Sequence, residues 1–167
     1  PGRAYMNTVA LLSKKFGIYL ASVLAAYVLA VVGASWHVAG RLASMGVMLD
    51  AGDRLAMTAR DLAGMAGMFV PIIAFGFLVA FLVTALLCRW PRALRASTCL
   101  ALYALAGFVA LVCIHVSLHL AFGLTPVAVA RTVPGLVGQG LAGALGGLVY
   151  RYLNEVVFPR SPFGIDT

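Results

Sequence analysis

The chain alternates long apolar stretches with shorter polar connections. A helix that crosses the roughly 30 Å hydrocarbon core of a bilayer needs about 20 mostly apolar residues. Four stretches meet this requirement, at about residues 16–36, 68–88, 99–122 and 133–153. The pattern predicts an all-α integral membrane protein, in which residues 1–167 form a single domain with four transmembrane helices.

Composition supports this interpretation. Hydrophobic residues make up 63% of the chain and charged residues 10%, whereas a soluble domain carries about 25% charged residues. The net charge of +7 could suggest a nucleic-acid partner. However, the charges flank the apolar spans and form no basic stripe on a polar surface. The partners we expect are the lipid bilayer and other membrane protein subunits, and no nucleic acid.

The placement of lysine and arginine predicts the orientation of the chain. Eight of the twelve basic residues fall on one side of the four spans: Arg3, Lys14, Lys15, Arg89, Arg92, Arg95, Arg151 and Arg160. The opposite side holds Arg41, Arg54, Arg60 and Arg131, offset by Asp50, Asp53 and Asp61. Basic residues are retained in cytoplasmic loops. We therefore expect a multi-pass protein of a bacterial inner membrane with cytoplasmic N- and C-termini.

The longest polar connection is the outer segment, residues 38–67. Asp53 is a reasonable N-cap, and Leu55, Ala59, Leu62 and Ala66 form an apolar stripe at helical spacing. One helix from Asp53 to Cys88 would be about 54 Å long, well beyond the bilayer. We therefore expect a short extracytoplasmic amphipathic helix at the membrane interface. A bend around Gly64, Gly67 and Pro71 would lead from it into the second span.

Methionines gather in this outer region. Met45 and Met48, and likewise Met65 and Met68, have M-x-x-M spacing. Thioether ligands select Cu(I), so these four methionines are candidate metal ligands. The alternative is that methionine is a flexible apolar filler against lipid or a partner.

Three histidines are expected at the outer side of the membrane. His115 and His119 are four residues apart, which places them on one helical face, and His37 ends the first span. Such imidazoles could bind haem or a metal, or hydrogen-bond a quinone headgroup. They could also only hydrogen-bond neighbouring helices.

The fourth span is rich in glycine. Gly143 and Gly147 form a G-x-x-x-G pair, and Gly138, Gln139 and Gly140 precede them. Small residues at this spacing let helix backbones approach closely, and a glutamine can hydrogen-bond across the contact. We expect these five residues to pack helices together. A broken helix around a transported substrate is the alternative.

The chain contains no sequence motif for catalysis. It lacks G-x-S-x-G, H-E-x-x-H, Walker and dinucleotide-binding patterns, and its three cysteines form no C-x-x-C pair. We therefore expect no enzyme, but a non-catalytic accessory or assembly subunit of a larger membrane complex, such as a respiratory or other energy-converting one. The first alternative is a small haem-, copper- or quinone-binding membrane protein. The second is a homo-oligomeric channel or carrier.

Overall fold

The protein is a bundle of four long helices. The computed structural model describes residues 2–89, 96–122 and 132–158. Its helices are α1 (Gly2–Ser44), α2 (Ala51–Arg89), α3 (Ala96–Phe122) and α4 (Val133–Val157), and this described part contains no strand. Each helix is long and apolar enough to cross a membrane. The predicted all-α fold with four membrane-spanning helices is confirmed, and the chain is a multi-pass membrane protein in contact with the bilayer.

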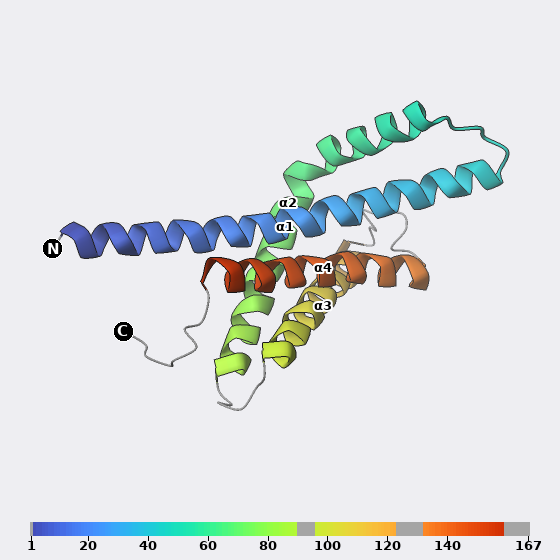
Figure 1. The fold of residues 1–167 in the computed structure, drawn as a ribbon. Coiled ribbons are helices and arrows are strands. Elements are labelled where there is room, and N and C mark those ends of the chain that lie inside the picture. The colour runs from blue at the N-terminus through green and yellow to red at the C-terminus, as the bar shows by residue number, and fades with distance from the viewer. Residues whose placement is uncertain (1, 90–95, 123–131, 159–167) are drawn as a thin grey trace.

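The helices form a closed ring of neighbours. α1 contacts α2, α2 contacts α3, α3 contacts α4, and α4 contacts α1. α1 and α4 lie side by side and run in opposite directions, while α3 and the second part of α2 cross them obliquely (Figure 1). α1 begins and α4 ends at the same end of the bundle, where Lys15 Nζ lies 5.9 Å from the centre of the Phe158 ring. We refer to this as the N-terminal end, and to the opposite end, with the turn at residues 45–50, as the hairpin end.

The first helix is much longer than its predicted span. It contains 43 residues, so it is about 64 Å long and exceeds the thickness of a bilayer. It ends at Ser44, and Gly46 two residues later has a φ of 87°, the left-handed conformation that glycine adopts readily. The amides of Gly46 and Val47 donate to the carbonyls of Ala43 and Leu42 at 3.1 Å each, which is a Schellman arrangement.

The second helix begins with a reciprocal aspartate cap. The Asp53 amide donates to Asp50 Oδ1 at 2.7 Å, and the Asp50 amide donates to Asp53 Oδ2 at 3.4 Å. The capping residue is therefore Asp50 rather than Asp53. Both carboxylates lie at the positive end of the helix dipole, where a negative charge is stabilising.

The segment expected as a separate amphipathic helix is the first part of α2. No turn interrupts the 39 residues from Ala51 to Arg89, although the helix changes direction part-way along (Figure 1). Pro71 lies inside it and has no amide hydrogen to donate to the Gly67 carbonyl. The loss of one hydrogen bond bends a helix without ending it, so this segment and the second span remain one element.

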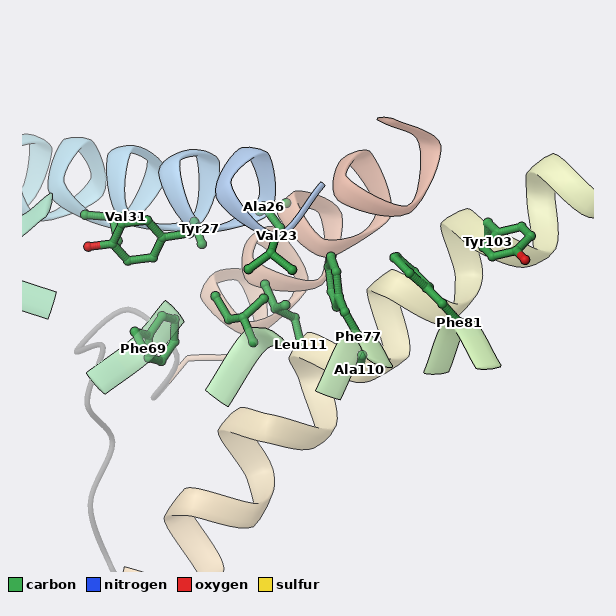
Figure 2. Packing of buried hydrophobic residues seen from close by; sticks show 14 residues of the cluster. Val23, Ala26, Tyr27, Val31, Phe69, Phe77, Phe81, Tyr103, Ala110 and Leu111 are labelled. Carbon is green, nitrogen blue, oxygen red and sulfur yellow. The ribbon is translucent and has the colours of Figure 1, made fainter. Parts of the chain in front are cut away.

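The interior is packed with apolar side chains from all four helices (Figure 2). Its most deeply buried large residues include Val23 of α1, Phe69 and Phe77 of α2, and Leu111 of α3. Towards the N-terminal end the packing is aromatic. The Phe81 ring stacks on Tyr150 with centroids 4.5 Å apart and meets Tyr103 edge-on at 5.6 Å. Apolar residues also cover the outer surface, as expected for helices that face lipid.

Helices α3 and α4 touch through their backbones. A Cβ atom added to Gly107 would overlap the Gly143 carbonyl, and one added to Gly143 would overlap the Gly107 carbonyl. One turn away, a Cβ at Gly147 would overlap the carbonyl of Tyr103. Small residues permit this approach, which van der Waals contact and hydrogen bonding favour in lipid.

This contact predicts opposite effects for two glycines on the same helix. Gly147→Ala should destabilise the protein by about 1–3 kcal/mol, because α3 must move to admit the methyl group. Gly138→Ala is the matched control, since an added Cβ there meets nothing within 4 Å. It should stabilise the protein by about 0.5–1 kcal/mol through helix propensity. Unfolding in mixed detergent micelles, followed by circular dichroism, measures both. Equal effects of the two substitutions would contradict the contact.

Candidate functional site

Hydroxyl groups on α1 hydrogen-bond to the backbones of its two neighbours. The buried Ser22 donates through Oγ to the Gly146 carbonyl of α4 at 2.8 Å. On the other side, the Tyr19 and Tyr27 hydroxyls donate to the carbonyls of Ala74 and Leu62 in α2. These two carbonyls lie on either side of the Pro71 bend. The bonds therefore fix α1 against α4 and against both parts of α2.

A serine–aspartate pair joins α1 and α2 near the hairpin end. Ser35 Oγ donates to Asp61 Oδ2 at 2.5 Å; Ser35 is buried and Asp61 is half-buried. Asp61 also lines a depression of about 410 Å³ together with neighbouring residues of α2 and the preceding turn: Leu49, Asp53, Ala56, Met57 and Arg60. Sequence analysis treated Asp61 only as a charge that offsets the outer arginines, because the packing of this part of α2 against α1 was not predicted.

His115 lies in the interior of the bundle. It is 2% exposed, and its Nδ1 is 2.8 Å from the carbonyl oxygen of Leu111 one turn earlier. Its ring meets Phe69 of α2 edge-on, with centroids 5.5 Å apart. The other ring nitrogen, Nε2, is buried and has no hydrogen-bond partner among the described residues. An unpaired buried acceptor costs about 1–3 kcal/mol, and the buried Gln139 Oε1 is in the same situation.

The other two candidate histidines lie outside. His37 and His119 are exposed, whereas His115 is buried, so the structure places the three candidate histidines in different surroundings. α2 covers α3 at His115, where Phe69 packs on the ring, but it does not cover His119 one turn later. Within residues 2–89, 96–122 and 132–158, no three histidine, cysteine or acidic side chains are grouped so that they could hold a metal ion.

The methionines form two separate pairs. Met45 and Met48 are 70% and 94% exposed in the turn that joins α1 to α2. Met65 packs partly against the core, while Met68 faces outward. The two pairs are separated by about 20 Å of α2, because 14 residues lie between its start and Met65. The structure therefore does not bring these four thioethers together as one set of ligands.

The glycine-rich face of α4 divides between two neighbours. Gly143 and Gly147 lie against α3, and Gly140 lies against the Phe108 ring of that helix. The buried Gln139 points the other way, and its Nε2 donates to the Ala30 carbonyl of α1 at 3.0 Å. Gly138 faces open space, so it takes no part in these contacts.

Two further glycines in the packing were missed by sequence analysis. Gly107 supplies the α3 half of the backbone contact, and a Cβ at Gly146 would come within 2.8 Å of both Ala26 and Phe77. Gly107 is an isolated glycine in a strongly apolar helix, and such a glycine usually has a packing reason. That signal could have identified it, but it does not indicate which helix approaches.

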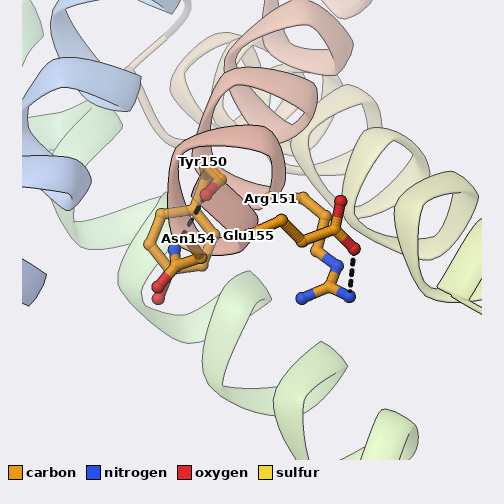
Figure 3. Close-up of polar contacts among 4 residues, drawn as sticks. All are labelled: Tyr150, Arg151, Asn154 and Glu155. Carbon is orange, nitrogen blue, oxygen red and sulfur yellow. Dashed lines mark hydrogen bonds and ion pairs between the residues drawn. The ribbon is translucent and has the colours of Figure 1, made fainter. Parts of the chain in front are cut away.

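The last turns of α4, at the N-terminal end of the bundle, carry an ion pair. Arg151 and Glu155 are joined at 2.5 Å, and Asn154 Nδ2 donates to the Tyr150 carbonyl at 2.8 Å (Figure 3). Each pair is four residues apart along the same helix. These contacts lie within one helix and stabilise the end of α4. They do not form an acid–base pair across a cavity, as a catalytic site would require.

A long groove runs along the outer surface between α2 and α3. Its volume is about 670 Å³. Small, mostly covered residues form its floor: Gly76, Ala80 and Thr84 of α2, and Ala106 and Ala110 of α3. Large exposed residues form its walls, among them Phe75, Val79, Val83, Leu105 and Val109. The Thr84 hydroxyl donates to the Ala80 carbonyl at 2.8 Å, so this polar group of the floor is already bonded. The groove offers shape and apolar surface to whatever binds there.

Comparison with protein-family models, curated proteins and solved structures finds no match to this chain. The functional argument therefore depends on a feature of the molecule itself, the apolar groove, which can bind a helix or a hydrocarbon chain.

Proposed function

We propose that the protein is a non-catalytic accessory or assembly subunit of a larger membrane complex, and that the α2/α3 groove binds a transmembrane helix of a partner subunit. The observation that carries the proposal is the arrangement of small residues along the floor of the groove. Gly76, Ala80 and Thr84 repeat every four residues on α2, and Ala106 and Ala110 do so on α3.

The groove suits a helix for reasons of packing. Lipid tails are as apolar as leucine, so helices associate in a bilayer through close contact rather than the hydrophobic effect. A floor of small residues lets a third backbone approach, and rows of larger residues on either side accept its side chains as ridges in a groove. A lipid or quinone tail needs no such floor, although the volume also falls within the range of about 300–1,000 Å³ typical of ligand pockets.

The charges of the described residues support an orientation for this subunit. Lys14, Lys15, Arg89 and Arg151 lie towards the N-terminal end of the bundle, where Arg151 is paired with Glu155. The hairpin end carries Arg41, Arg54 and Arg60 together with Asp50, Asp53 and Asp61. By the positive-inside rule, the N-terminal end lies in the cytoplasm of a bacterial cell and the hairpin end lies outside the inner membrane.

Filling the groove should release the partner. Ala80→Leu and Ala106→Leu place a large side chain on the floor, so the chain should lose its co-migration with a larger complex on a native gel while remaining folded. Ala101→Leu is the matched control, because Ala101 is exposed on α3 and does not line the groove. It should leave the complex intact.

A photo-crosslinker at the position of Val109 identifies what the groove holds. A crosslink to a transmembrane segment of a different protein, lost in Ala80→Leu, supports the proposal. A crosslink to a second copy of this chain favours the homo-oligomeric channel or carrier instead. A crosslink to lipid or quinone alone, with unchanged migration of the floor variants, contradicts the proposal.

The proposed orientation predicts which ends react with an impermeant maleimide in intact cells. In a chain whose three natural cysteines are replaced by serine, Met48→Cys should react before lysis, because Met48 is 94% exposed at the hairpin end. Ser97→Cys, exposed at the start of α3, should react only after lysis. The reverse order would show that the orientation is wrong.

A further inference from the structure

The α2/α3 groove is longer than one leaflet of a bilayer is thick. Along α3 it extends from Leu102 to Leu118, which is about 24 Å of helix. Along α2 it extends from Ile72 to Leu87, about 22 Å. The hydrocarbon core of a bilayer is about 30 Å thick, so one leaflet contributes about 15 Å. The occupant of the full groove must therefore reach across both leaflets.

The packing of α3 on α4 shows the depth at which the groove lies. Gly107 opposes Gly143 where the two helices touch, and the helices run in opposite directions. Ten residues further towards the hairpin end, Ser117 of α3 is therefore about level with Val133, the first residue of α4. The groove opens at this level, where the apolar sequence of α4 begins, and continues past the middle of the membrane.

The lining of the groove selects an uncharged occupant. No lysine, arginine, aspartate or glutamate lines it, so a charged side chain inside it would have no partner of opposite charge. A phospholipid tail hangs from a headgroup at the membrane surface, so it covers only the part of the groove in its own leaflet. An apolar helix that spans the membrane covers the whole length.

One hydroxyl of the groove is left for the occupant. Thr84 already donates to the Ala80 carbonyl of its own helix. Ser117, in contrast, is exposed in the groove, and its hydroxyl makes no hydrogen bond among the described residues. Serine hydroxyls hydrogen-bond across helix contacts in membranes, so an oxygen atom of the occupant opposite Ser117 would satisfy this donor.

We propose, on the basis of the proposed function, that the partner helix crosses the entire hydrocarbon core and presents to the groove an uncharged face about 16 residues long. Near its end on the hairpin side, this helix accepts a hydrogen bond from the Ser117 hydroxyl. The small residues of the floor bring the partner helix close, and the hydrogen bond fixes how far along the groove it lies.

Photo-crosslinkers at the two ends of the groove test the length of the contact. In place of Leu102 and Leu118, they should capture the same transmembrane segment as a crosslinker at Val109. Mass spectrometry should place the two end crosslinks about 16 residues apart in that segment, with no charged residue on its facing side. A crosslinker in place of Ala101, which is exposed outside the groove, is the control and should capture lipid.

The crosslinks separate this inference from the proposed function. If Val109 captures a partner helix but Leu102 or Leu118 captures only lipid, the proposed function stands and the full-length contact is wrong. If none of these positions captures another protein, the proposed function itself fails.

Substitutions of Ser117 test the hydrogen bond. Ser117→Ala should lower the ratio of partner-bound to free chain about two- to threefold, the usual effect of one hydrogen bond between membrane helices. Ser117→Thr keeps the hydroxyl and should restore the ratio. Ser97→Ala removes an exposed hydroxyl of α3 outside the groove and should have no effect. An unchanged ratio in Ser117→Ala would mean that this hydroxyl bonds only to water at the membrane surface, and it would overturn the hydrogen bond.

Discussion

The structure depends on the direct backbone contact between α3 and α4. Gly107, Gly143 and Gly147 admit no side chain between the two helices, so both the separation and the register of this pair are fixed. In lipid, where apolar side chains gain little from leaving the solvent, such a contact holds helices together by close packing and polar bonds. The level of Ser117 relative to Val133 follows from this register.

Because α4 meets α3 so closely, its other face is free to hold α1. Ser22 and Gln139 bond across that second contact to backbone carbonyls, and Tyr19 and Tyr27 extend the bonding to α2. On the outer side of α2 and α3, the described residues show no backbone contact of this kind, and the floor of small residues forms the groove. Among the described residues, this groove is the apolar surface on which the proposed role as a subunit is based.

The sequence predicted the four spans because apolar runs of sufficient length have one stable solution in a bilayer. It did not predict the continuity of α2, since whether Pro71 bends or ends a helix depends on contacts such as those of Tyr19 and Tyr27 with α2. The glycine pattern on α4 indicated close packing, but it did not show that α3 covers Gly143 while Gly138 faces open space. In the same way, the spacing of His115 and His119 predicted that both lie on one face of α3, but α2 covers only His115. The groove was missed because its floor combines residues from two helices, and neither half is conspicuous alone.

The backbone contact is tested most directly by solid-state NMR on the protein in lipid bilayers, with glycine Cα and carbonyl carbons labelled. The structure predicts a cross-peak between Gly107 Cα and the Gly143 carbonyl carbon, assigned by its loss in Gly107→Ala. The absence of this cross-peak, in spectra where sequential and intrahelical glycine contacts are present, would contradict the account of the fold and everything built on its register.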